Sequence, residues 1–262
     1  MTYLERLHPR QGLRVLVTAG ASGIGAAIAA AFLEAGAKVA ICDVDEAALD
    51  KFRAEHPDVQ GVAADVSDPE AVDRLFDVVE HTFGGLDVLV NNAGVSGPTG
   101  MIETLSIDEI RRTIEIDLVG QLVVIRRAAK LLKQSNDAAI INISSVAGRF
   151  GYAMRSPYSA SKWGIVGLTA SLAKEMGPEG VRVNAILPGV VRGARMDRVI
   201  TAKAEASGRT FAEVEEEYVS SISLRRMVEP DDVALTVLFL SSPAGANISG
   251  QAIGVCANVE YL

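Results

Sequence analysis

Cysteine and histidine are scarce in this chain of 262 residues, which has two of the former and three of the latter. Cys42 and Cys256 lie far apart and form no C-x-x-C pair, so neither a zinc site nor a disulfide framework is indicated. The three histidines, His8, His56 and His81, form no H-E-x-x-H pattern. We therefore expect no metal site in this protein.

An excess of positive charge and long apolar runs are also missing. Lys and Arg number 25 against 33 Asp and Glu, which gives a net charge of −8. A protein that binds nucleic acid needs a basic surface, so no nucleic-acid partner is expected. The apolar runs are too short or too interrupted by charge to span a membrane, and residues 1–12 lack the apolar segment of a secretory signal. We therefore expect a cytoplasmic protein without a membrane partner.

The length and the apolar content suit one large domain. Hydrophobic residues make up 49% of the chain, which predicts a substantial core and a single domain over residues 1–262. Short apolar runs alternate with helical segments. Strands are expected at 13–18, 38–42, 59–64, 86–91, 138–143, 181–187 and 251–256. Helices are expected at 23–34, 45–55, 68–83, 107–133 (one long helix or a bent pair), 157–176 and 231–240.

This alternation predicts an α/β fold. Runs of consecutive apolar residues are typical of strands that are buried on both faces. Alternating strands and helices then indicate a Rossmann-type, doubly wound parallel sheet of about seven strands, with helices on both faces. Only residues 190–227, which include the acidic run EVEEEY at 213–218, interrupt the alternation. An insertion at the carboxyl end of a parallel strand is expected to form a lid over a substrate.

A glycine-rich segment, VTAGASGIG at 17–25, joins the first expected strand to the first expected helix. Gly20, Gly23 and Gly25 have the spacing G-x-x-G-x-G, which differs from the G-x-G-x-x-G of many dinucleotide-binding loops. Glycines at such a turn let the backbone approach a pyrophosphate, which the free N–H groups of the helix amino terminus can bind. By spacing alone, a turn without a ligand is an open alternative.

An acidic residue, Asp43, follows the second expected strand, 18 residues after Gly25. A carboxylate at this place accepts hydrogen bonds from the adenosine ribose hydroxyls and repels a 2′-phosphate. No Lys or Arg follows it, since the next three residues are Val44, Asp45 and Glu46. An aspartate can end a strand without any ligand, but together with the glycine loop it favours NAD(H) over NADP(H).

Tyr158 and Lys162 are four residues apart in the segment SPYSASKW at 156–163, where a helix is expected to start. This spacing places both side chains on one face of the helix. A nearby ammonium lowers the pKa of a phenol toward neutrality, so that the phenol can exchange a proton with an alcohol or carbonyl oxygen. The spacing alone is common in helices. The segment NISSVAG at 142–148 adds a serine at the carboxyl edge of the sheet, where ligands bind.

Together these segments resemble the short-chain dehydrogenase/reductase family, in its NAD-dependent form. The resemblance extends from about residue 13 to residue 256. The matching segments are TAGASGIG (18–25), DVSD (65–68), NNAG (91–94), NISSVAG (142–148), YSASK (158–162) and VRVNAILPG (181–189). The resemblance implies an NAD-dependent enzyme that interconverts a secondary alcohol, or a sugar hydroxyl, and a carbonyl by hydride transfer. It also implies a homotetramer.

The resemblance further implies roles for individual residues. Tyr158 is the acid/base, Lys162 supports it and holds the nicotinamide ribose, and Ser145 orients the substrate oxygen. Ser144 is the structural neighbour of that serine, and Asn91 steadies the sheet. The implied cofactor-binding residues are Gly20, Ser22, Gly23, Ile24, Gly25, Asp43, Asp65, Val66, Asn92, Ala93, Gly94, Tyr158, Lys162, Pro188, Gly189 and Val191.

Four positions depart from the family pattern. Ala19 replaces a glycine of the loop, and we expect it to keep a negative φ and to spare the cofactor. Asp117 stands where relatives carry an asparagine and is included among the catalytic residues. It either places a carboxylate near Lys162 in a proton relay or caps a helix bend without chemistry. Arg192 replaces a threonine expected at the nicotinamide, and VCAN at 255–258 replaces a common acidic, glycine-rich ending.

Arginines recur in the segments that are expected to contact the substrate, at Arg149, Arg155, Arg192 and Arg195. A guanidinium fork suits a carboxylate, sulfonate or phosphate, so the substrate is predicted to be a sugar, a polyol or an anionic hydroxy compound. The alternative is that these arginines pair with the acidic lid at the surface. A 3-oxoacyl-thioester reductase-like enzyme and a non-catalytic NAD-binding sensor or scaffold are two further hypotheses. The intact Tyr-x-x-x-Lys pair argues against the sensor or scaffold.

Overall fold

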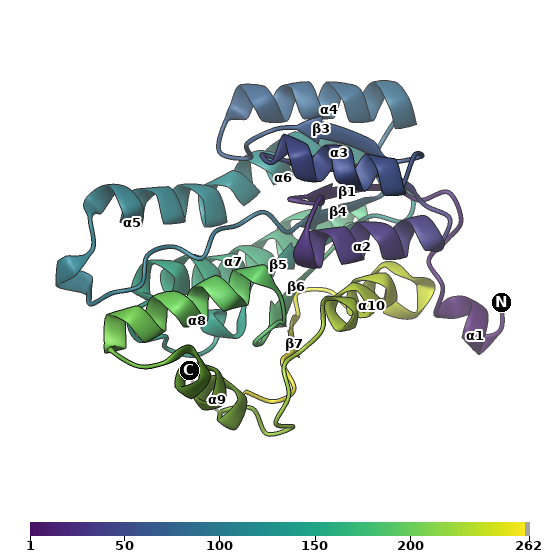
Figure 1. Ribbon diagram of the computed structural model, residues 1–262. Helices are drawn as coiled ribbons and strands as arrows, with labels where there is room; N and C mark the ends of the chain where they lie inside the picture. The colour runs from purple at the N-terminus through teal and green to yellow at the C-terminus, as the bar shows by residue number, and fades with distance from the viewer. Residues whose placement is uncertain (260–262) are drawn as a thin grey trace.

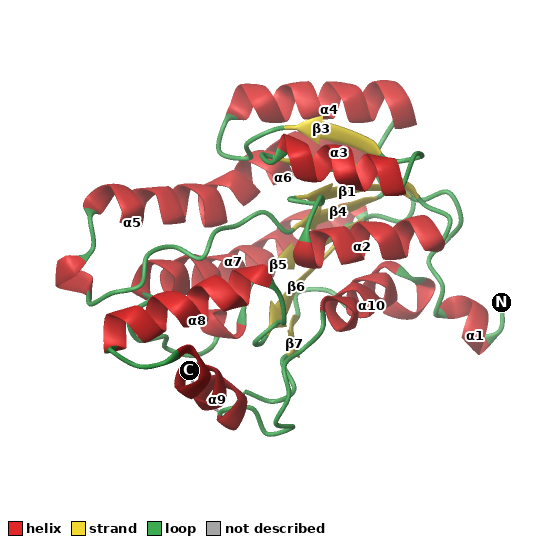
Figure 2. Ribbon diagram, in the orientation of Figure 1, coloured by secondary structure: helices red, strands yellow, loops and turns green. Residues whose placement is uncertain are grey.

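Seven parallel strands form one sheet with helices on both of its faces in the computed structural model, which describes residues 1–259 (Figure 1, Figure 2). The strands are β1 (Arg14–Thr18), β2 (Lys38–Asp43), β3 (Gln60–Ala63), β4 (Val88–Asn91), β5 (Ala139–Ile143), β6 (Arg182–Pro188) and β7 (Ala252–Val255). The helices are α1 (Tyr3–Arg6), α2 (Gly23–Glu34), α3 (Glu46–Glu55), α4 (Pro69–Phe83), α5 (Ile107–Ile114), α6 (Gly120–Leu132), α7 (Ser156–Met176), α8 (Ala194–Ser207), α9 (Phe211–Ser220) and α10 (Pro230–Ser241). Within residues 1–259, no helix has both the length and the apolar character that a membrane span requires.

The strand order, β3-β2-β1-β4-β5-β6-β7, reverses between β1 and β4. The chain winds outward from β1 to β3 on one side of this point and from β4 to β7 on the other. Loops that leave two such strands diverge to opposite faces, which opens a crevice at the carboxyl ends. The glycine loop follows β1 and the NNAG segment follows β4, so both lie beside this crevice. The predicted Rossmann-type, doubly wound fold is confirmed.

Different helices cover the two faces of the sheet, because neighbouring side chains along a strand point to opposite sides. On one face, α4, α6 and α7 contribute Phe76, Leu132 and Met176 to a buried apolar cluster. On the other face, α2, α3 and α10 contribute Phe32, Phe52 and Leu240 to a second cluster. Every residue of β4 and β5 is buried. This explains why the strands contain continuous apolar runs in place of alternating ones.

The segment expected as one long helix or a bent pair consists of α5 and α6, joined by a π-helical turn at Glu115–Val119. Such turns insert one extra residue and are frequent at functional sites. Ile116 and Asp117 are buried in this turn. The turn packs against α7, so a carboxylate lies next to the helix that contains Tyr158.

Residues 190–227 contain two helices, α8 and α9, which sequence analysis did not predict. A local sequence signal for α9 was available, because Thr210 and Glu213 form a capping box at its start. Ile200, Val214 and Tyr218 belong to an apolar cluster of this segment. Figure 1 shows both helices beyond the end of the sheet at which α2 begins. The segment therefore covers the carboxyl ends of the central strands.

The amino ends of β1 and β4 are joined by an ion pair between a partly exposed arginine and a buried carboxylate. Asp87 is 2% exposed and accepts hydrogen bonds from Arg14 Nε at 2.9 Å and from Arg14 Nη2 at 2.7 Å. The hydroxyl of Ser135 donates a third bond at 2.6 Å. Burial opposes ionisation, but these hydrogen bonds lower the pKa of the Asp87 carboxyl to about 2. This ion pair lies at the edge of the sheet opposite the crevice.

Candidate active site

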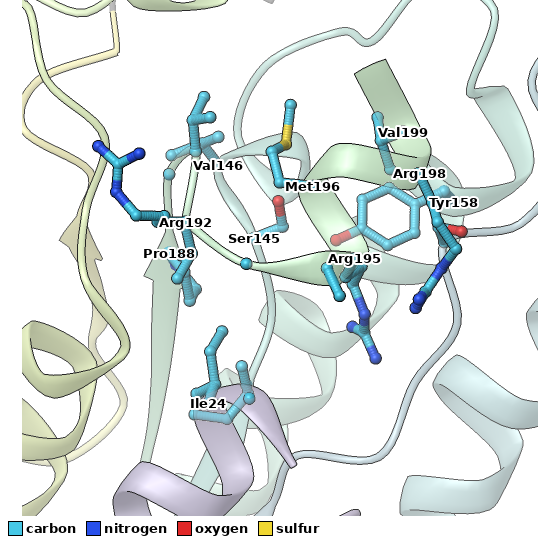
Figure 3. Close-up of a pocket in the computed structure, with 18 of the residues that line it drawn as sticks. Ile24, Ser145, Val146, Tyr158, Pro188, Arg192, Arg195, Met196, Arg198 and Val199 are labelled. Carbon is cyan, nitrogen blue, oxygen red and sulfur yellow. The ribbon is translucent and has the colours of Figure 1, made fainter. Parts of the chain in front are cut away.

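A cavity of about 480 Å³ lies at the carboxyl ends of the strands. Its walls come from the segments that follow β1, β4, β5 and β6, and from α7 and α8. Figure 3 shows Ile24 of α2 on one side of the cavity and Met196 and Val199 of α8 on another, with Ser145 and Tyr158 between them. Segments that are more than 100 residues apart in the sequence thus meet around one space.

Ser145, Tyr158 and Lys162 all line this cavity. Tyr158 lies in the first turn of α7 and Lys162 one turn later, with Lys162 Nζ 5.5 Å from the centre of the Tyr158 ring. Ser145 follows β5, and its Oγ accepts a hydrogen bond from the N–H of Ala147 at 3.1 Å. In Figure 3 the phenol oxygen of Tyr158 points across the cavity toward Ser145. A substrate oxygen between these two side chains could bond to both hydroxyl groups.

Polar residues of the sheet hold the start of α7 in place. The hydroxyl of Ser144 donates to the carbonyl oxygen of Lys162 at 2.8 Å, which joins the end of β5 to α7. Lys162 is 3% exposed, and its Nζ also lies 3.4 Å from the carbonyl oxygen of Ile143. On the neighbouring strand, Asn91 Nδ2 donates to Asn142 Oδ1 at 3.2 Å. Ser144 and Asn91 thus connect structural elements, and of the two only Ser144 lines the cavity.

Asp117 places a buried carboxylate beside Lys162. Its Oδ1 accepts a hydrogen bond from the N–H of Val95 at 2.6 Å, and its Oδ2 accepts one from Ser161 Oγ at 3.1 Å. Oδ2 also lies 3.8 Å from Lys162 Nζ. A Cβ on Gly94 would lie 3.0 Å from Asp117 Oδ1, so the small residue leaves room for this approach. The structure therefore places the carboxylate next to the lysine and within the π-helical turn. Its part in a proton relay stays a prediction.

Ala19 has a φ of 49°, so the expectation of a negative φ is wrong. The reason is close packing around its carbonyl oxygen. A Cβ on Gly25 would lie 2.0 Å from this oxygen, and Asn92 Nδ2 donates a hydrogen bond to it at 3.0 Å. The carbonyl group is thus held between α2 and the segment after β4, which leaves Ala19 in the left-handed region at a cost of about 1 kcal/mol.

The glycine loop is also joined to the segment after β4 through Thr18. The Oγ1 of Thr18 accepts hydrogen bonds from the N–H groups of Asn92 and Ala93, both at 2.9 Å. Asn92 Nδ2 donates to the carbonyl oxygen of Thr18 at 3.1 Å. The two loops that border the crevice therefore form one hydrogen-bonded unit.

Acidic side chains mark the end of the crevice near β2. Asp43 is 9% exposed and accepts hydrogen bonds from the N–H of Ala21 at 3.2 Å and of Asp45 at 3.1 Å. Asp65 similarly accepts bonds from the N–H and the hydroxyl of Ser67. Asp45 lines the cavity. Because Asp43 contacts the glycine loop directly, its charge is fixed close to the amino terminus of α2.

The structure brings part of the predicted site into the cavity wall. The predicted cofactor-binding residues that line it are Ser22, Gly23, Ile24, Asn92, Tyr158, Lys162, Pro188, Gly189 and Val191. The predicted residues that do not line it are Gly20, Gly25, Asp43, Asp65, Val66, Ala93, Gly94 and Asp117. Several members of the second group lie directly behind the wall, where they pack or hydrogen-bond to residues that line it.

Other residues of the cavity were not identified from the sequence. Tyr152 and Tyr218 contact each other through their hydroxyls, whose oxygens are 2.6 Å apart. Burial raises the pKa of both phenols. Met196, Arg198 and Val199 reach the cavity from α8. No sequence pattern marks these five residues, because they meet only when residues 190–227 fold over the loop between β5 and α7.

Two of the four predicted arginines have surface contacts. Arg149 donates to the carbonyl oxygen of Ala252 at 2.9 Å. Arg192 Nε lies 3.0 Å from Glu229 Oε1, and Figure 3 shows its guanidinium directed away from Ser145 and Tyr158. Both side chains thus have partners at the surface, but neither partner belongs to the acidic segment 190–227 with which pairing was expected.

The other two arginines, Arg155 and Arg195, line the cavity, as Arg192 also does. Arg195 Nη2 donates to the carbonyl oxygen of Gly94 at 2.6 Å, which joins α8 to the segment after β4. Arg155 is 3% exposed, and its guanidinium carbon lies 5.1 Å from the ring centre of Tyr152 and 4.9 Å from that of Tyr158. Positive charge therefore remains at the part of the cavity beside Tyr158.

A doubly wound sheet, a glycine loop at its switch point and a serine, a tyrosine and a lysine around one cavity define a nucleotide-dependent oxidoreductase. The family model described as Enoyl-(Acyl carrier protein) reductase matches residues 18–257. The chain belongs to the short-chain dehydrogenase/reductase family, whose members bind a nicotinamide cofactor and act on hydroxyl or carbonyl groups.

Individual relatives align over nearly the whole chain. The cis-4-hydroxycyclohexanecarboxylate dehydrogenase of Sinomonas cyclohexanicum is 37% identical over 243 residues, which are 92% of this chain and 93% of the relative. The structure of actinorhodin polyketide ketoreductase with NADPH has a TM-score of 0.91 and 30% identity, and covers 96% of this chain and 98% of its own. The structure of NAD⁺-bound xylitol dehydrogenase has a TM-score of 0.91 and 27% identity, and the match covers 95% of this chain and 99% of that chain.

Proposed function

We propose that this protein catalyses the NAD(H)-dependent interconversion of a secondary alcohol and a ketone. The observation that carries the proposal is that Ser145, Tyr158 and Lys162 line one cavity with the glycine loop. In the oxidative direction the phenolate of Tyr158 accepts the hydroxyl proton of the substrate. The hydroxyl of Ser145 donates a hydrogen bond to the same oxygen, and the ammonium of Lys162 stabilises the phenolate.

The residues around the crevice fit a dinucleotide. Gly23 and Ile24 line the cavity at the amino terminus of α2, whose free N–H groups suit a pyrophosphate. A Cβ on Gly94 would lie 3.2 Å from Lys162 Nζ. Because glycine has no Cβ, this ammonium stays accessible for a ribose hydroxyl. When bound, the nicotinamide ring supplies the acceptor for the hydride that leaves the substrate carbon. The protein then has to position the alcohol and hold its proton.

NAD is proposed in preference to NADP. The carboxylates of Asp43 and Asp45 lie at the end of β2, where the adenosine ribose of a dinucleotide would lie. The residue between them is Val44, and no lysine or arginine follows directly. A 2′-phosphate would therefore meet negative charge without a compensating cation.

The substrate is proposed to be a compact hydroxy compound with an anionic group. Arg155 and Arg195 supply positive charge at the cavity, and Met196 and Val199 supply an apolar wall. A ring that carries a hydroxyl at one end and a carboxylate at the other suits this combination. The name of the relative that acts on cis-4-hydroxycyclohexanecarboxylate supports this class.

A second candidate is the reduction of a 3-oxoacyl thioester. The description of the matching family model and the similarity to a polyketide ketoreductase favour it. The two candidates differ in the preferred substrate and direction. Consumption of NADH or NADPH with acetoacetyl-CoA would favour the thioester reductase, whereas NADH formation with hydroxy acids would favour the dehydrogenase.

The decisive experiment measures NADH formation from NAD with matched substrates. The panel contains cis-4-hydroxycyclohexanecarboxylate, the neutral analogue cyclohexanol, and xylitol. Tyr158→Phe is expected to lower kcat by at least about 100-fold, because it removes the group that exchanges the proton. Tyr3→Phe is the matched control, since the Tyr3 side chain is exposed and lies outside the cavity. Unaltered turnover in Tyr158→Phe would refute the mechanism.

A homotetramer is proposed for the assembly. Leu122 of α6 and Trp163 of α7 are 41% and 51% exposed on one surface, and Leu235 of α10 is 63% exposed on another. Two separate apolar surfaces suit an assembly with more than one kind of interface. Sedimentation velocity would test this, and a monomer at micromolar concentration would contradict it.

A further inference from the structure

Arg155 is a buried cation without a carboxylate partner in the part of the chain that the structure describes, residues 1–259. Its side chain is 3% exposed. One Nη donates to the carbonyl oxygen of Ser96, and the buried Nε donates to no protein acceptor. A buried charge is costly unless another group interacts with it. The neighbours of this guanidinium therefore indicate its role.

The guanidinium of Arg155 lies over two tyrosine rings, 4.9 Å from the centre of Tyr158 and 5.1 Å from the centre of Tyr152. A cation within about 6 Å of an aromatic ring is attracted to its face. The attraction increases when the ring carries the full negative charge of a phenolate. Tyr152 contacts Tyr218 through its hydroxyl, and burial raises the pKa of Tyr152 and of Tyr218. Tyr158 is therefore the ring whose anion would balance the charge of Arg155.

The second cation near Tyr158 has a counter-charge of its own. Lys162 Nζ is 5.5 Å from the centre of the Tyr158 ring but only 3.8 Å from Asp117 Oδ2. Asp117 is fully buried, so water does not screen its charge effectively. The carboxylate thus offsets much of the positive potential that Lys162 alone would create at the phenol.

We propose that Arg155 is a positioning residue that stabilises the phenolate of Tyr158. Its positive charge compensates for that of Lys162, which Asp117 largely neutralises. The inference rests on the proposed function, in which Tyr158 acts as the phenolate. Arg155, Lys162 and Asp117 carry a net charge of +1, and the phenolate of Tyr158 makes the group neutral. Without Arg155 the same group would carry a net negative charge in a buried site.

Other titratable side chains surround the group. From α9, Tyr218 faces it through Tyr152, and Glu217 lies near this pair. From α8, Arg195 and Arg198 line the same cavity. Both of these arginines are exposed, so water and salt screen their effect on the phenol more than that of the buried Arg155.

The test follows the ionisation of Tyr158 directly and needs no substrate. The near-ultraviolet absorbance of tyrosinate is titrated with pH in the NAD-bound protein and in Tyr158→Phe, and the difference isolates Tyr158 from the other tyrosines. In Arg155→Met the midpoint of the difference is expected to move to higher pH by about one to two units. This is the effect expected from the loss of one positive charge at about the distance of Arg155 from the ring. Arg155→Lys is expected to keep most of the wild-type midpoint. In Asp117→Asn the midpoint is expected to move to lower pH.

The double variant Asp117→Asn/Arg155→Met is expected to return close to the wild-type midpoint, because one charge of each sign is lost. Arg149→Met is the matched control, since it removes an exposed arginine outside the cavity. It is expected to leave the midpoint unchanged. The pH at which kcat/KM is half-maximal should follow the same pattern in turnover measurements.

Three results would overturn the proposal. An unchanged midpoint in Arg155→Met, together with a lower melting temperature, would make Arg155 structural. An unchanged midpoint with a higher KM for the anionic substrate only would make it a substrate anchor. If Arg155→Met does not fold, an unchanged midpoint in Asp117→Asn overturns the proposal instead. Because the absorbance titration is independent of turnover, a failure to find activity would refute the proposed function without deciding the role of Arg155.

Discussion

Replacing Asp87 by asparagine should change how the stability of this protein depends on pH. The carboxylate joins the amino ends of β1 and β4 through hydrogen bonds from Arg14 and Ser135. An amide of the same size keeps one acceptor oxygen but directs N–H groups toward the guanidinium. The variant therefore loses the ion pair and leaves the Arg14 charge without its partner.

The magnitude follows from the pKa of the Asp87 carboxyl, which is lowered from 3.8 to about 2. A carboxyl whose pKa is lower in the folded state stabilises the fold above its unfolded pKa and loses this effect as the pH falls through the folded pKa. The shift corresponds to about 2 kcal/mol of stability at neutral pH. About 1 kcal/mol of this is lost by pH 3, and nearly all below pH 2.

Urea unfolding at about pH 7 and at about pH 3 measures this effect. The difference in unfolding free energy between the wild type and Asp87→Asn is expected to be about 1 kcal/mol smaller at the lower pH. Ser135→Ala removes one of the hydrogen bonds and should show a smaller change. At neutral pH, kcat/KM should be unaltered in both variants, because Asp87 and Ser135 lie at the edge of the sheet opposite the cavity. A pH-independent difference would refute the reasoning.

Three further substitutions test the cofactor side of the cavity. Gly25→Ala should weaken NAD binding at least about tenfold, because its Cβ would lie 2.0 Å from the carbonyl oxygen of Ala19. Calorimetry checks this, and an unchanged Kd contradicts it. Ala19→Gly should raise the free energy of unfolding by about 1 kcal/mol, because it relieves a φ of 49°. Denaturant titration measures the gain, and no gain would mean that the backbone is unstrained. Asp43→Asn should lower the ratio of kcat/KM for NAD over NADP by about tenfold, because the charge that repels a 2′-phosphate is lost. An unchanged ratio would assign cofactor choice to other residues.

The elements of the sheet could be predicted because their signals are local. Each central strand is a short apolar run between turn residues, and some covering helices have clear start and end signals. Thus Pro69 follows the capping Asp68 at the start of α4, and Gly84 ends this helix in the left-handed conformation. Such signals depend on residues within one turn or one strand of each other. The parallel, doubly wound sheet then followed from the alternation of strands and helices, whereas the strand order came from the structure.

Contacts between distant segments could not be predicted in the same way. The sequence indicated that Asp117 stands near the active site, but two hypotheses for its side chain were open. The π-helical turn and the contacts with Val95 and Ser161 placed its carboxylate beside Lys162. A part for it in a proton relay stays a prediction. The helices of residues 190–227 were missed because this segment is charged and its apolar residues form a small cluster of their own.

The sequence by itself therefore determined the order of the elements, the family, and the side chains that the family places at the carboxyl edge of the sheet. These depend on local pattern and on motif order, which the chain carries in linear form. Only the tertiary structure decided the left-handed backbone of Ala19, the contact between Tyr152 and Tyr218, and the position of Arg155 over Tyr158. Each of these depends on packing between segments whose distance in space has no counterpart in their spacing along the chain.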